Sequence, residues 1–268
     1  MEKWICCFKE RILKDIFVEQ KPVSIIMPVL GNIEYTKSFF NSFYKNTSGD
    51  YEFIIINNGK DEETKLFLLD LVNKDNKIIV FQNEENVGVS ASWNQGINKS
   101  KNDFICIMNN DIEILTPNWI FEMQKCLQIN KNIDWVSPST CYTKNPKKRC
   151  FRPHHYEQLM YGSDIDSYIV GCCFMCPKEA FDEIGLFDED FDVKYYEDLD
   201  FINRILSRGK KVSMVKSVIV YHAVGATSRI TKGGENNENR YKDKWAATPY
   251  DILGMQPSRV KGIKHFNR

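Results

Sequence analysis

One carboxylate in the sequence stands where a metal ion could be held. Asp111 follows two amides, Asn109 and Asn110, directly after the apolar run Phe104–Met108. A carboxylate flanked by amide oxygens at the end of a buried strand can bind a hard divalent cation and leave positions open for diphosphate oxygens. His222, at the end of a later β-branched run, could complete the coordination sphere as a neutral imidazole. The competing interpretation is structural, because Asn and Asp are also frequent in turns and a lone histidine is more often a structural donor.

A second group of carboxylates, Glu197, Asp198 and Asp200, lies at the start of a predicted helix. Acidic residues in this position interact favourably with the helix dipole and cap free backbone N–H groups, which is a structural explanation. The same position also suits a carboxylate that is ionised near neutral pH and ready to accept a proton. Asp198 and Glu197 are therefore candidate acid–base residues, and helix capping is the alternative interpretation.

A regular alternation of strands and helices must position these residues. The predicted strands are 23–27, 51–56, 78–81, 103–108, 168–176 and 212–221, and the predicted helices are 35–46, 62–73, 90–100, 119–128, 178–184 and 199–206. Such alternation with short polar turns predicts an α/β fold with a Rossmann-like, mostly parallel sheet and helices on both faces. Ligands of these sheets bind outside the carboxyl ends of the strands. Polar clusters at 28–32, 57–60, 83–88 and 109–111 all follow strands, which predicts a site at that edge.

Composition excludes several functional classes. Lys plus Arg and Asp plus Glu each number 36, so the formal net charge is zero and nothing attracts the chain globally to nucleic acid. The apolar runs fall short of the ~20 residues that cross a bilayer. Neither GxxxxGKS/T nor GxGxxG occurs, which argues against ATP hydrolysis and dinucleotide redox chemistry.

The nine cysteines and the absence of an export signal favour reduced thiols in a cytoplasmic enzyme. Cys173 and Cys176 have the spacing of a zinc-binding pair. They fall in a predicted strand, however, which places them on opposite faces of the sheet. We therefore expect these thiols to pack in the core and not to hold a structural zinc ion.

The predicted domain organisation is simple. Residues 1–21 form an amphipathic helix, residues 22–250 a single domain, and residues 251–268 a short basic tail. Within the domain, 22–115 is the expected nucleotide-binding half and 116–250 the acceptor-side half. The N-terminal helix has three open interpretations: docking on the body, self-association into a homodimer, or peripheral contact with the inner face of a membrane.

Two irregular segments of the second half carry open alternatives. The basic loop Lys144–Arg152 is either a solvated surface loop or an attractor for an anionic acceptor. The segment Gly225–Arg240 contains Gly233 and Gly234 as candidate hinges. It is either a lid that closes over a donor and excludes water or an ordinary loop.

A series of short motifs runs in a fixed order from residue 22 to about residue 250. The motifs are VSIIMPV (23–29), IIINNG (54–59), NEENVG (83–88), WNQG (93–96), MNND (108–111), GCCF (171–174), GLFDEDF (185–191), YED (196–198) and VYH (220–222). Together they resemble glycosyltransferase family 2, whose members have the GT-A fold and are inverting, nucleotide-sugar-dependent enzymes. An ordered series that spans nearly the whole chain is far more specific than any single short motif.

The resemblance implies a role for each matching residue. Pro28, Val29 and Asn57 would line the base and ribose pocket. Asn86, Gly88 and Asn94 would shape the diphosphate and sugar side. Asn109 and Asn110 would join the nucleotide-sugar site beside Asp111 and His222, the expected ligands of Mn²⁺ or Mg²⁺. Asp198 would be the general base, and Glu197 would orient the acceptor or the neighbouring network.

Two positions depart from the family pattern. Asn57 and Asn109 each stand where the family usually has Asp. An Asn carbonyl can still accept the ring N–H of uracil or thymine, so pyrimidine binding survives. The loss of one carboxylate at the metal motif lowers its negative charge and puts tight metal binding without nucleotide in doubt.

The resemblance implies transfer of a hexosyl or N-acetylhexosaminyl group with inversion of configuration. The first-choice donor is a UDP-sugar, and the second choice is a dTDP-sugar. The acceptor would be a hydroxyl of a glycan, a lipid-linked glycan or a protein, as in polysaccharide biosynthesis. Two alternatives belong to other classes. One is a non-catalytic carbohydrate-binding protein on the same fold, and the other is a sugar nucleotidyltransferase.

Overall fold

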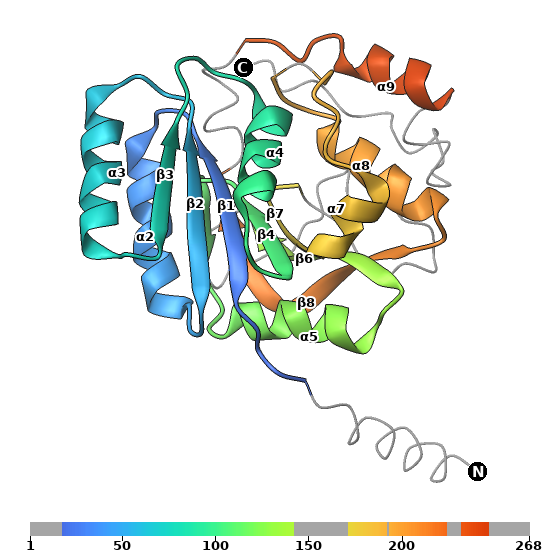
Figure 1. The fold of residues 1–268 in the computed structure, drawn as a ribbon, viewed down its shortest axis with the longest axis horizontal. Helices are drawn as coiled ribbons and strands as arrows, with labels where there is room; N and C mark the ends of the chain where they lie inside the picture. The colour runs from blue at the N-terminus through green and yellow to red at the C-terminus, as the bar shows by residue number, and fades with distance from the viewer. Residues whose placement is uncertain (1–17, 142–170, 192, 224–231, 247–268) are drawn as a thin grey trace.

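The computed structural model describes residues 18–141, 171–191, 193–223 and 232–246 (Figure 1). The strands in this part of the chain are β1 (Val23–Val29), β2 (Tyr51–Asn57), β3 (Ile78–Gln82), β4 (Phe104–Met108), β5 (Ile112–Ile114), β6 (Ile133–Cys141), β7 (Cys173–Pro177) and β8 (Lys211–His222). They form one sheet in the order β3-β2-β1-β4-β7-β6-β8-β5. The sheet therefore runs without a break from the first half of the chain into the second.

Helices cover both faces of this sheet (Figure 1). They are α2 (Ile33–Asn46), α3 (Glu62–Lys74), α4 (Val89–Lys99), α5 (Trp119–Ile129), α7 (Lys178–Ile184), α8 (Glu197–Ser207) and α9 (Asn237–Trp245). Helices α2, α3 and α5 contribute to one buried apolar cluster, and α4, α7 and α8 to the other. The expected arrangement of helices on both faces is confirmed.

Strand direction changes along the sheet. β1 pairs in parallel with β2 and β4, and β2 pairs in parallel with β3, as the strand–helix alternation predicts. β7 runs antiparallel to β4 and to β6, and β5 runs antiparallel to β8, whereas β6 and β8 are parallel. The mostly parallel sheet is confirmed, and each of its antiparallel pairs includes a strand of the second half, β7 or β8.

Local sequence explains how the helices dock. In α2, Phe39, Phe40 and Phe43 share one face, and their ring centroids lie 5.8, 5.1 and 5.2 Å from that of Phe53 in β2. Such aromatic pairs add about 0.5–1.5 kcal/mol each beyond area burial. On the other face, Gly96 lets α4 approach β1, because a Cβ at this position would overlap Ile26.

Three elements are absent from the sequence-based assignment. β5 is too short to show a pattern, and β6 contains a run of polar residues and proline at 137–140, all buried. α9 combines charged and polar residues with two aromatic ones, Tyr241 and Trp245. The last four residues of the segment Gly225–Arg240 belong to α9, so an ordinary loop is wrong for this end, and the lid stays a prediction. Residues 224–231 lie outside the described part.

The two cysteines of the zinc alternative lie on opposite faces, as predicted. Cys173 belongs to the cluster that α2 and α5 cover, and Cys176 to the cluster that α4 and α8 cover. The two thiols therefore cannot chelate one ion together. Both are fully buried free thiols.

Several predicted features lie partly or wholly outside the described residues. Residues 1–17 of the N-terminal segment, the basic loop 144–152 and the tail 251–268 are among them. Residues 18–22 are described and are not helical, so the predicted helix does not reach residue 21. Among the described helices, none has the length and apolar character that crossing a bilayer requires.

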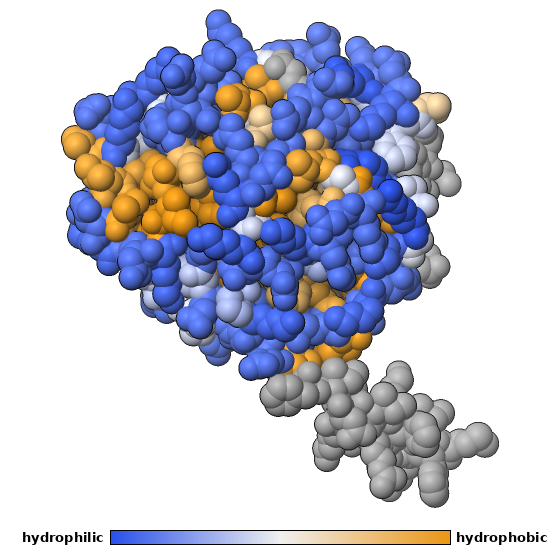
Figure 2. All heavy atoms as spheres, viewed as in Figure 1, coloured by the Kyte–Doolittle hydropathy of each residue, from blue (hydrophilic) through white to orange (hydrophobic). Residues whose placement is uncertain are grey.

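The surface in Figure 2 is mainly hydrophilic, with apolar side chains gathered over α3 and β3. Leu66 and Leu69 of α3 are each 58% exposed, and Ile79 of the edge strand β3 is 36% exposed. This side lies at the far end of the sheet from β5 and β8.

Candidate active site

The predicted base pocket lies where β1 and β2 end. Val29 and Asn57 are register partners at the ends of these strands, one position after Pro28. Asn57 is 1% exposed, and its Oδ1 accepts the N–H of Gly59 at 3.0 Å while its Nδ2 donates to Gln82 Oε1 at 2.8 Å. The Asn57 amide thus fixes its own loop, and its carbonyl oxygen keeps a second lone pair.

The N-terminus of α4 forms the next part of the edge. Gly88 precedes the helix at φ +84°, and its N–H donates to Asn86 Oδ1 at 3.1 Å. Asn94 is 3% exposed, and its side chain holds Phe187 by two bonds, from Nδ2 to the carbonyl and from the Phe187 N–H to Oδ1, each 2.9 Å. Asn94 therefore joins α4 to the second half of the chain. This structural role is additional to the sugar-side role that the resemblance implies.

Asp111 and His222 are brought together by strands distant in sequence. Ile112 of β5 is the register partner of His222 at the end of β8, and His222 Nε2 lies 3.3 Å from Asp111 Oδ1. Burial by itself lowers the pKa of His222, but contacts with Cys172 and Asp111 outweigh it and raise that pKa well above its usual value. The two expected metal ligands are neighbours.

Asn109 and Asn110, which precede Asp111, each donate a hydrogen bond to a neighbouring element. The N–H of Asn109 donates to the carbonyl of Cys172 at 2.8 Å, which ties the end of β4 to the residue before β7. Nδ2 of Asn110 donates to Thr36 Oγ1 of α2 at 3.0 Å. The contacts of these two residues orient the loop that carries Asp111.

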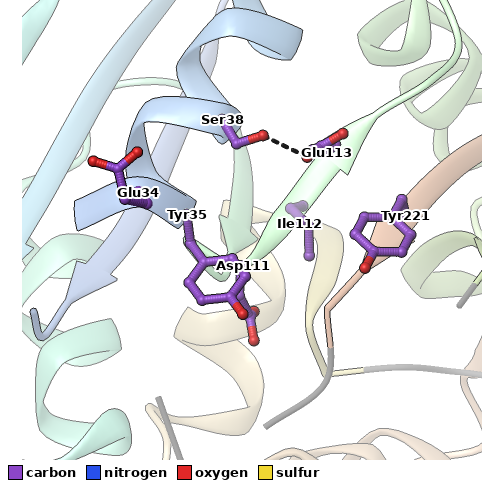
Figure 3. Close-up of a pocket in the computed structure, with 7 residues that line it drawn as sticks. All are labelled: Glu34, Tyr35, Ser38, Asp111, Ile112, Glu113 and Tyr221. Carbon is purple, nitrogen blue, oxygen red and sulfur yellow. Dashed lines mark hydrogen bonds between the residues drawn. The ribbon is translucent and has the colours of Figure 1, made fainter. Parts of the chain in front are cut away.

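Asp111 also lines a pocket of about 180 Å³, drawn in Figure 3. The other lining residues come from α2, β5 and β8: Glu34, Tyr35, Ser38, Ile112, Glu113 and Tyr221. Asp111 is only 6% exposed, and its Oδ1 has no hydrogen-bond partner although it faces His222. A carboxylate oxygen and an imidazole nitrogen in this arrangement fit a divalent cation.

The protein contributes few ligands to such a cation. Within the described ranges, no group of three or more His, Cys, Asp and Glu side chains could hold a metal ion. The Asp111–His222 pair therefore leaves most of a cation's coordination sphere open to other ligands.

Glu197 and Asp198 begin α8, directly after two residues in the left-handed region. Tyr195 and Tyr196 both have φ 74°. Asp198 Oδ1 accepts the N–H of Leu199 at 2.9 Å, and the backbone of Gly171 lies against Oδ2, where any Cβ would overlap the carboxylate. The left-handed turn and the close approach of Gly171 together fix the direction of the Asp198 side chain.

The two carboxyl groups differ in protonation. Burial, and then the nearby charge of Asp198, raise the pKa of Glu197 to about 8. Burial also raises the pKa of Asp198, against the opposing effect of N–H groups from Leu199 and Gly171. Because backbone donors stabilise the Asp198 anion, whereas Glu197 Oε2 has no hydrogen-bond partner in the described structure, the pair keeps its proton on Glu197 near neutral pH.

One short segment joins the two sites. Gly171 lies against Asp198, and Cys172 lies against His222 and Asp111. Consecutive Cα atoms are about 3.8 Å apart, so the Asp111–His222 and Glu197–Asp198 pairs flank the same stretch of chain. This arrangement places the Asp111–His222 pair beside the Glu197–Asp198 pair at the carboxyl edge of the sheet.

The family model described as "Glycosyl transferase family 2" matches residues 24–185, more than half of the chain. The chain belongs to glycosyltransferase family 2. Its curated relatives include an uncharacterized glycosyltransferase of Rickettsia prowazekii, 26% identical over 259 residues, which cover 91% of this chain and 76% of the relative. An uncharacterized glycosyltransferase of Rickettsia bellii is 33% identical over 228 residues, 80% of this chain and 32% of the relative.

Solved structures confirm the GT-A fold of this family 2 member. A crystal structure of GalNAc-T7 with UDP, GalNAc and Mn²⁺ superposes with a TM-score of 0.61 at 17% identity, over 75% of this chain and 43% of that one. A mannosyltransferase of Pyrobaculum calidifontis in complex with GDP-Man and Mn²⁺ superposes with a TM-score of 0.57 at 12% identity. The match covers 82% of this chain and 64% of that one. At these identities the likeness establishes the fold alone.

Sequence reasoning found Asp200 only as one of three carboxylates at the start of a helix and missed the residues of α9 that hold it in this glycosyltransferase. Asp200, fully buried, receives bonds from Arg204, Lys244 and Trp245. The spacing of Asn237, Tyr241, Lys244 and Trp245 is that of one helix face, which was a usable signal. The polar character of these residues makes the buried helix face hard to recognise in the sequence, because charged helices are usually solvated.

Proposed function

We propose that this chain is an inverting, metal-dependent glycosyltransferase that moves a sugar from a nucleoside-diphosphate sugar to an acceptor hydroxyl. The first-choice donor is a UDP-sugar, and the second choice is a dTDP-sugar. Family membership supports sugar transfer as the reaction class. The observation that carries the finer proposal is the position of Gly171 and Cys172 between the Asp111–His222 pair and the Glu197–Asp198 pair. A leaving group and an attacking hydroxyl need stabilisation of opposite kinds a few ångströms apart, and these pairs could supply both.

On the donor side, Asp111 and His222 would hold Mn²⁺ or Mg²⁺. The cation, when bound, offsets the negative charge that develops on the departing nucleoside diphosphate. Asn86 and Gly88 would shape the diphosphate side beside the N-terminus of α4, whose dipole favours anions, while Gly88 itself packs against the backbone of Val193. The two Mn²⁺-containing neighbours of the same fold support a divalent metal here.

On the acceptor side, Asp198 would accept the proton of the attacking hydroxyl. As that O–H bond breaks, the oxygen forms a bond to the anomeric carbon from the face opposite the diphosphate. The bond from the anomeric carbon to the diphosphate oxygen breaks with its electron pair, which inverts the configuration. Glu197, neutral near pH 7, would orient the acceptor by donating a hydrogen bond.

The identity of the nucleotide and of the partners is also part of the proposal. The free lone pair of Asn57 Oδ1 could accept the ring N–H of a pyrimidine base, with Pro28 and Val29 beside it. We propose a hydroxyl of a glycan, lipid-linked glycan or protein as acceptor, in a cytoplasmic reaction. Peripheral membrane contact and a homodimer remain proposals that rest on the sequence of residues 1–21.

A panel of nucleotide sugars tests the proposal. Thermal unfolding with each compound, with and without Mn²⁺, should reveal a UDP-sugar that stabilises the fold more when the metal is present. At a hundred times the Kd the stabilisation is about 2.7 kcal/mol. Release of UDP from the same compound identifies an enzyme, whereas binding without release identifies a carbohydrate-binding protein. A panel in which no nucleotide sugar binds contradicts the proposal.

A further inference from the structure

Helix α9 packs over the first turn of α8, although its first residue, Asn237, lies 40 positions after Glu197, the first residue of α8. In Figure 1 it is the red helix above α8. Tyr241 is fully buried, its hydroxyl bonds with Asn203 of α8, and its ring lies 5.5 Å from that of Tyr196. The residue that immediately precedes Glu197 therefore packs against α9.

α9 also holds the backbone turn before the carboxylates. Val193, Tyr195 and Tyr196 all have positive φ, which is unfavourable for residues with a side chain and most of all for a β-branched one. Asn237 Nδ2 donates to the carbonyls of Lys194 and Tyr195 at 2.8 and 3.1 Å. Strained backbone persists only where its surroundings determine it strongly, and α9 supplies these bonds.

The third contact is electrostatic and converges on Asp200. Lys244 Nζ lies 2.8 Å from Asp200 Oδ1 and 2.6 Å from Asp188 Oδ2, and Trp245 Nε1 donates to Asp200 Oδ1 at 3.0 Å. Asp200 is fully buried, its other oxygen accepts from Arg204 Nε at 3.0 Å, and its N–H donates to Tyr196 O. The side chain of Asp200 is thus held from α9 while its backbone completes the first turn of α8, two residues after Asp198.

We propose that α9 is the positioning element of the Glu197–Asp198 pair, with Lys244 and Trp245 acting as positioning residues through Asp200. The inference rests on the proposed function in so far as Asp198 is the base. The turn over 193–196 and the first turn of α8 are fixed at both ends by α9. Loss of the α9 contacts should let Asp198 leave the orientation that Leu199 and Gly171 favour.

Two lysines of α9 provide a matched pair for the test. Lys244 reaches Asp200, whereas Lys242, two residues away, pairs with Glu238 on the same helix, 2.7 Å from its Oε1. Lys244→Gln should lower kcat by up to about 100-fold, as small misplacements of reacting groups do, and leave the KM for the donor unchanged, while the melting temperature falls because the buried Asp200 loses one of its partners. Lys242→Gln should change none of these, and Lys244→Arg should restore most of the lost turnover.

A second measurement does not depend on activity. Hydrogen exchange at the Leu199 amide, which bonds to Asp198, should speed up in Lys244→Gln and in Trp245→Phe but not in Lys242→Gln. If exchange and kcat respond alike to both lysine substitutions, α9 is not the positioning element. Faster exchange with unchanged kcat also overturns the inference, while loss of transfer in Asp198→Asn upholds the proposed function in either case. If the wild type transfers nothing, the proposed function fails, and the exchange data alone decide whether α9 orders the turn.

Discussion

The Asp111–His222 pair and the Glu197–Asp198 pair are both buried carboxylate sites, yet their surroundings are opposite in kind. Asp111 follows a strand and faces an imidazole 3.3 Å away. Glu197 and Asp198 are the first two residues of a helix, and burial, then the nearby charge of Asp198, raises the pKa of Glu197 to about 8. The first pair is suited to a cation, and the second to a proton.

The difference teaches that a carboxylate's role follows from its neighbours more than from its sequence motif. Asp111 has a buried oxygen, Oδ1, that lies 3.3 Å from the imidazole Nε2 of His222. Asp198 has backbone N–H donors that favour its anion, and beside it the pKa of Glu197 is raised to about 8. Three single substitutions test this contrast, and a triple variant of the basic loop has the smallest expected effect.

Asp111→Ala should abolish sugar transfer, because it removes the carboxylate that lies 3.3 Å from His222. The fold should stay intact, as judged by the melting temperature. Glu113→Gln is the matched control, since Glu113 lines the same pocket but bonds with Ser38. Full activity of the wild type in excess chelator would be incompatible with the metal role.

Asp198→Asn keeps the size and hydrogen bonding of the side chain and removes the proton acceptor. Turnover should fall about 10²–10⁴-fold while affinity for the donor barely changes. Asp61→Asn is the control for capping alone, because Asp61 caps α3 by accepting the N–H of Thr64 at 2.9 Å. If Asp198→Asn loses stability or donor binding and keeps its turnover number, the capping interpretation is correct.

Glu197→Gln should change how stability depends on pH. The folded-state pKa of Glu197, about 8, is above the unfolded value of about 4.3, so the folded state holds the extra proton between these values. This contribution is complete below pH ~4.3 and is lost as pH rises through about 8, with a slope of up to about 1.4 kcal/mol per pH unit. Gln, always neutral, should remove that slope.

Urea unfolding from pH 5 to 8.5 measures the effect of Glu197→Gln. The variant should gain stability relative to the wild type as pH rises. Glu179→Gln, an exposed residue in the first turn of α7, should follow the wild-type curve. Parallel curves for all three proteins would mean that Glu197 is ionised in the folded state.

The smallest effect is expected from the basic loop 144–152, which lies outside the described residues. Changing Lys147, Lys148 and Arg149 to Glu should raise the KM for an anionic, lipid-linked acceptor at low salt and leave donor hydrolysis unchanged. Each basic residue near an anionic surface contributes about 1 kcal/mol, which salt screens. Wild-type acceptor kinetics at every ionic strength would show that the loop is merely solvated.

The first half of the fold was predictable because its signals are local. Each of β1, β2, β3 and β4 is an apolar, mostly β-branched run that ends in a polar turn, and each helix between them has an apolar stripe. β6 was not predictable, since Ser137, Pro138, Ser139 and Thr140 break the apolar pattern although all are buried. Its burial depends on neighbours distant in sequence.

The site was predictable to the same degree. The proximity of Asp111 and His222 follows from the rule that strand ends converge, and β5–β8 pairing brings them together. The roles of Gly171 and Asp200 depend on segments that meet only in three dimensions. Lys244 looks like any solvated lysine in the sequence, and only the fold places it on a buried carboxylate.

The most direct test of the contrast is UDP binding by calorimetry as a function of Mn²⁺, in the wild type, Asp111→Asn and Asp198→Asn. The account predicts that Mn²⁺ strengthens UDP binding in the wild type and equally in Asp198→Asn. In Asp111→Asn, UDP binding should no longer depend on Mn²⁺. An undiminished Mn²⁺ effect in Asp111→Asn, or its loss in Asp198→Asn, would contradict the assignment of the cation to one pair and the proton to the other.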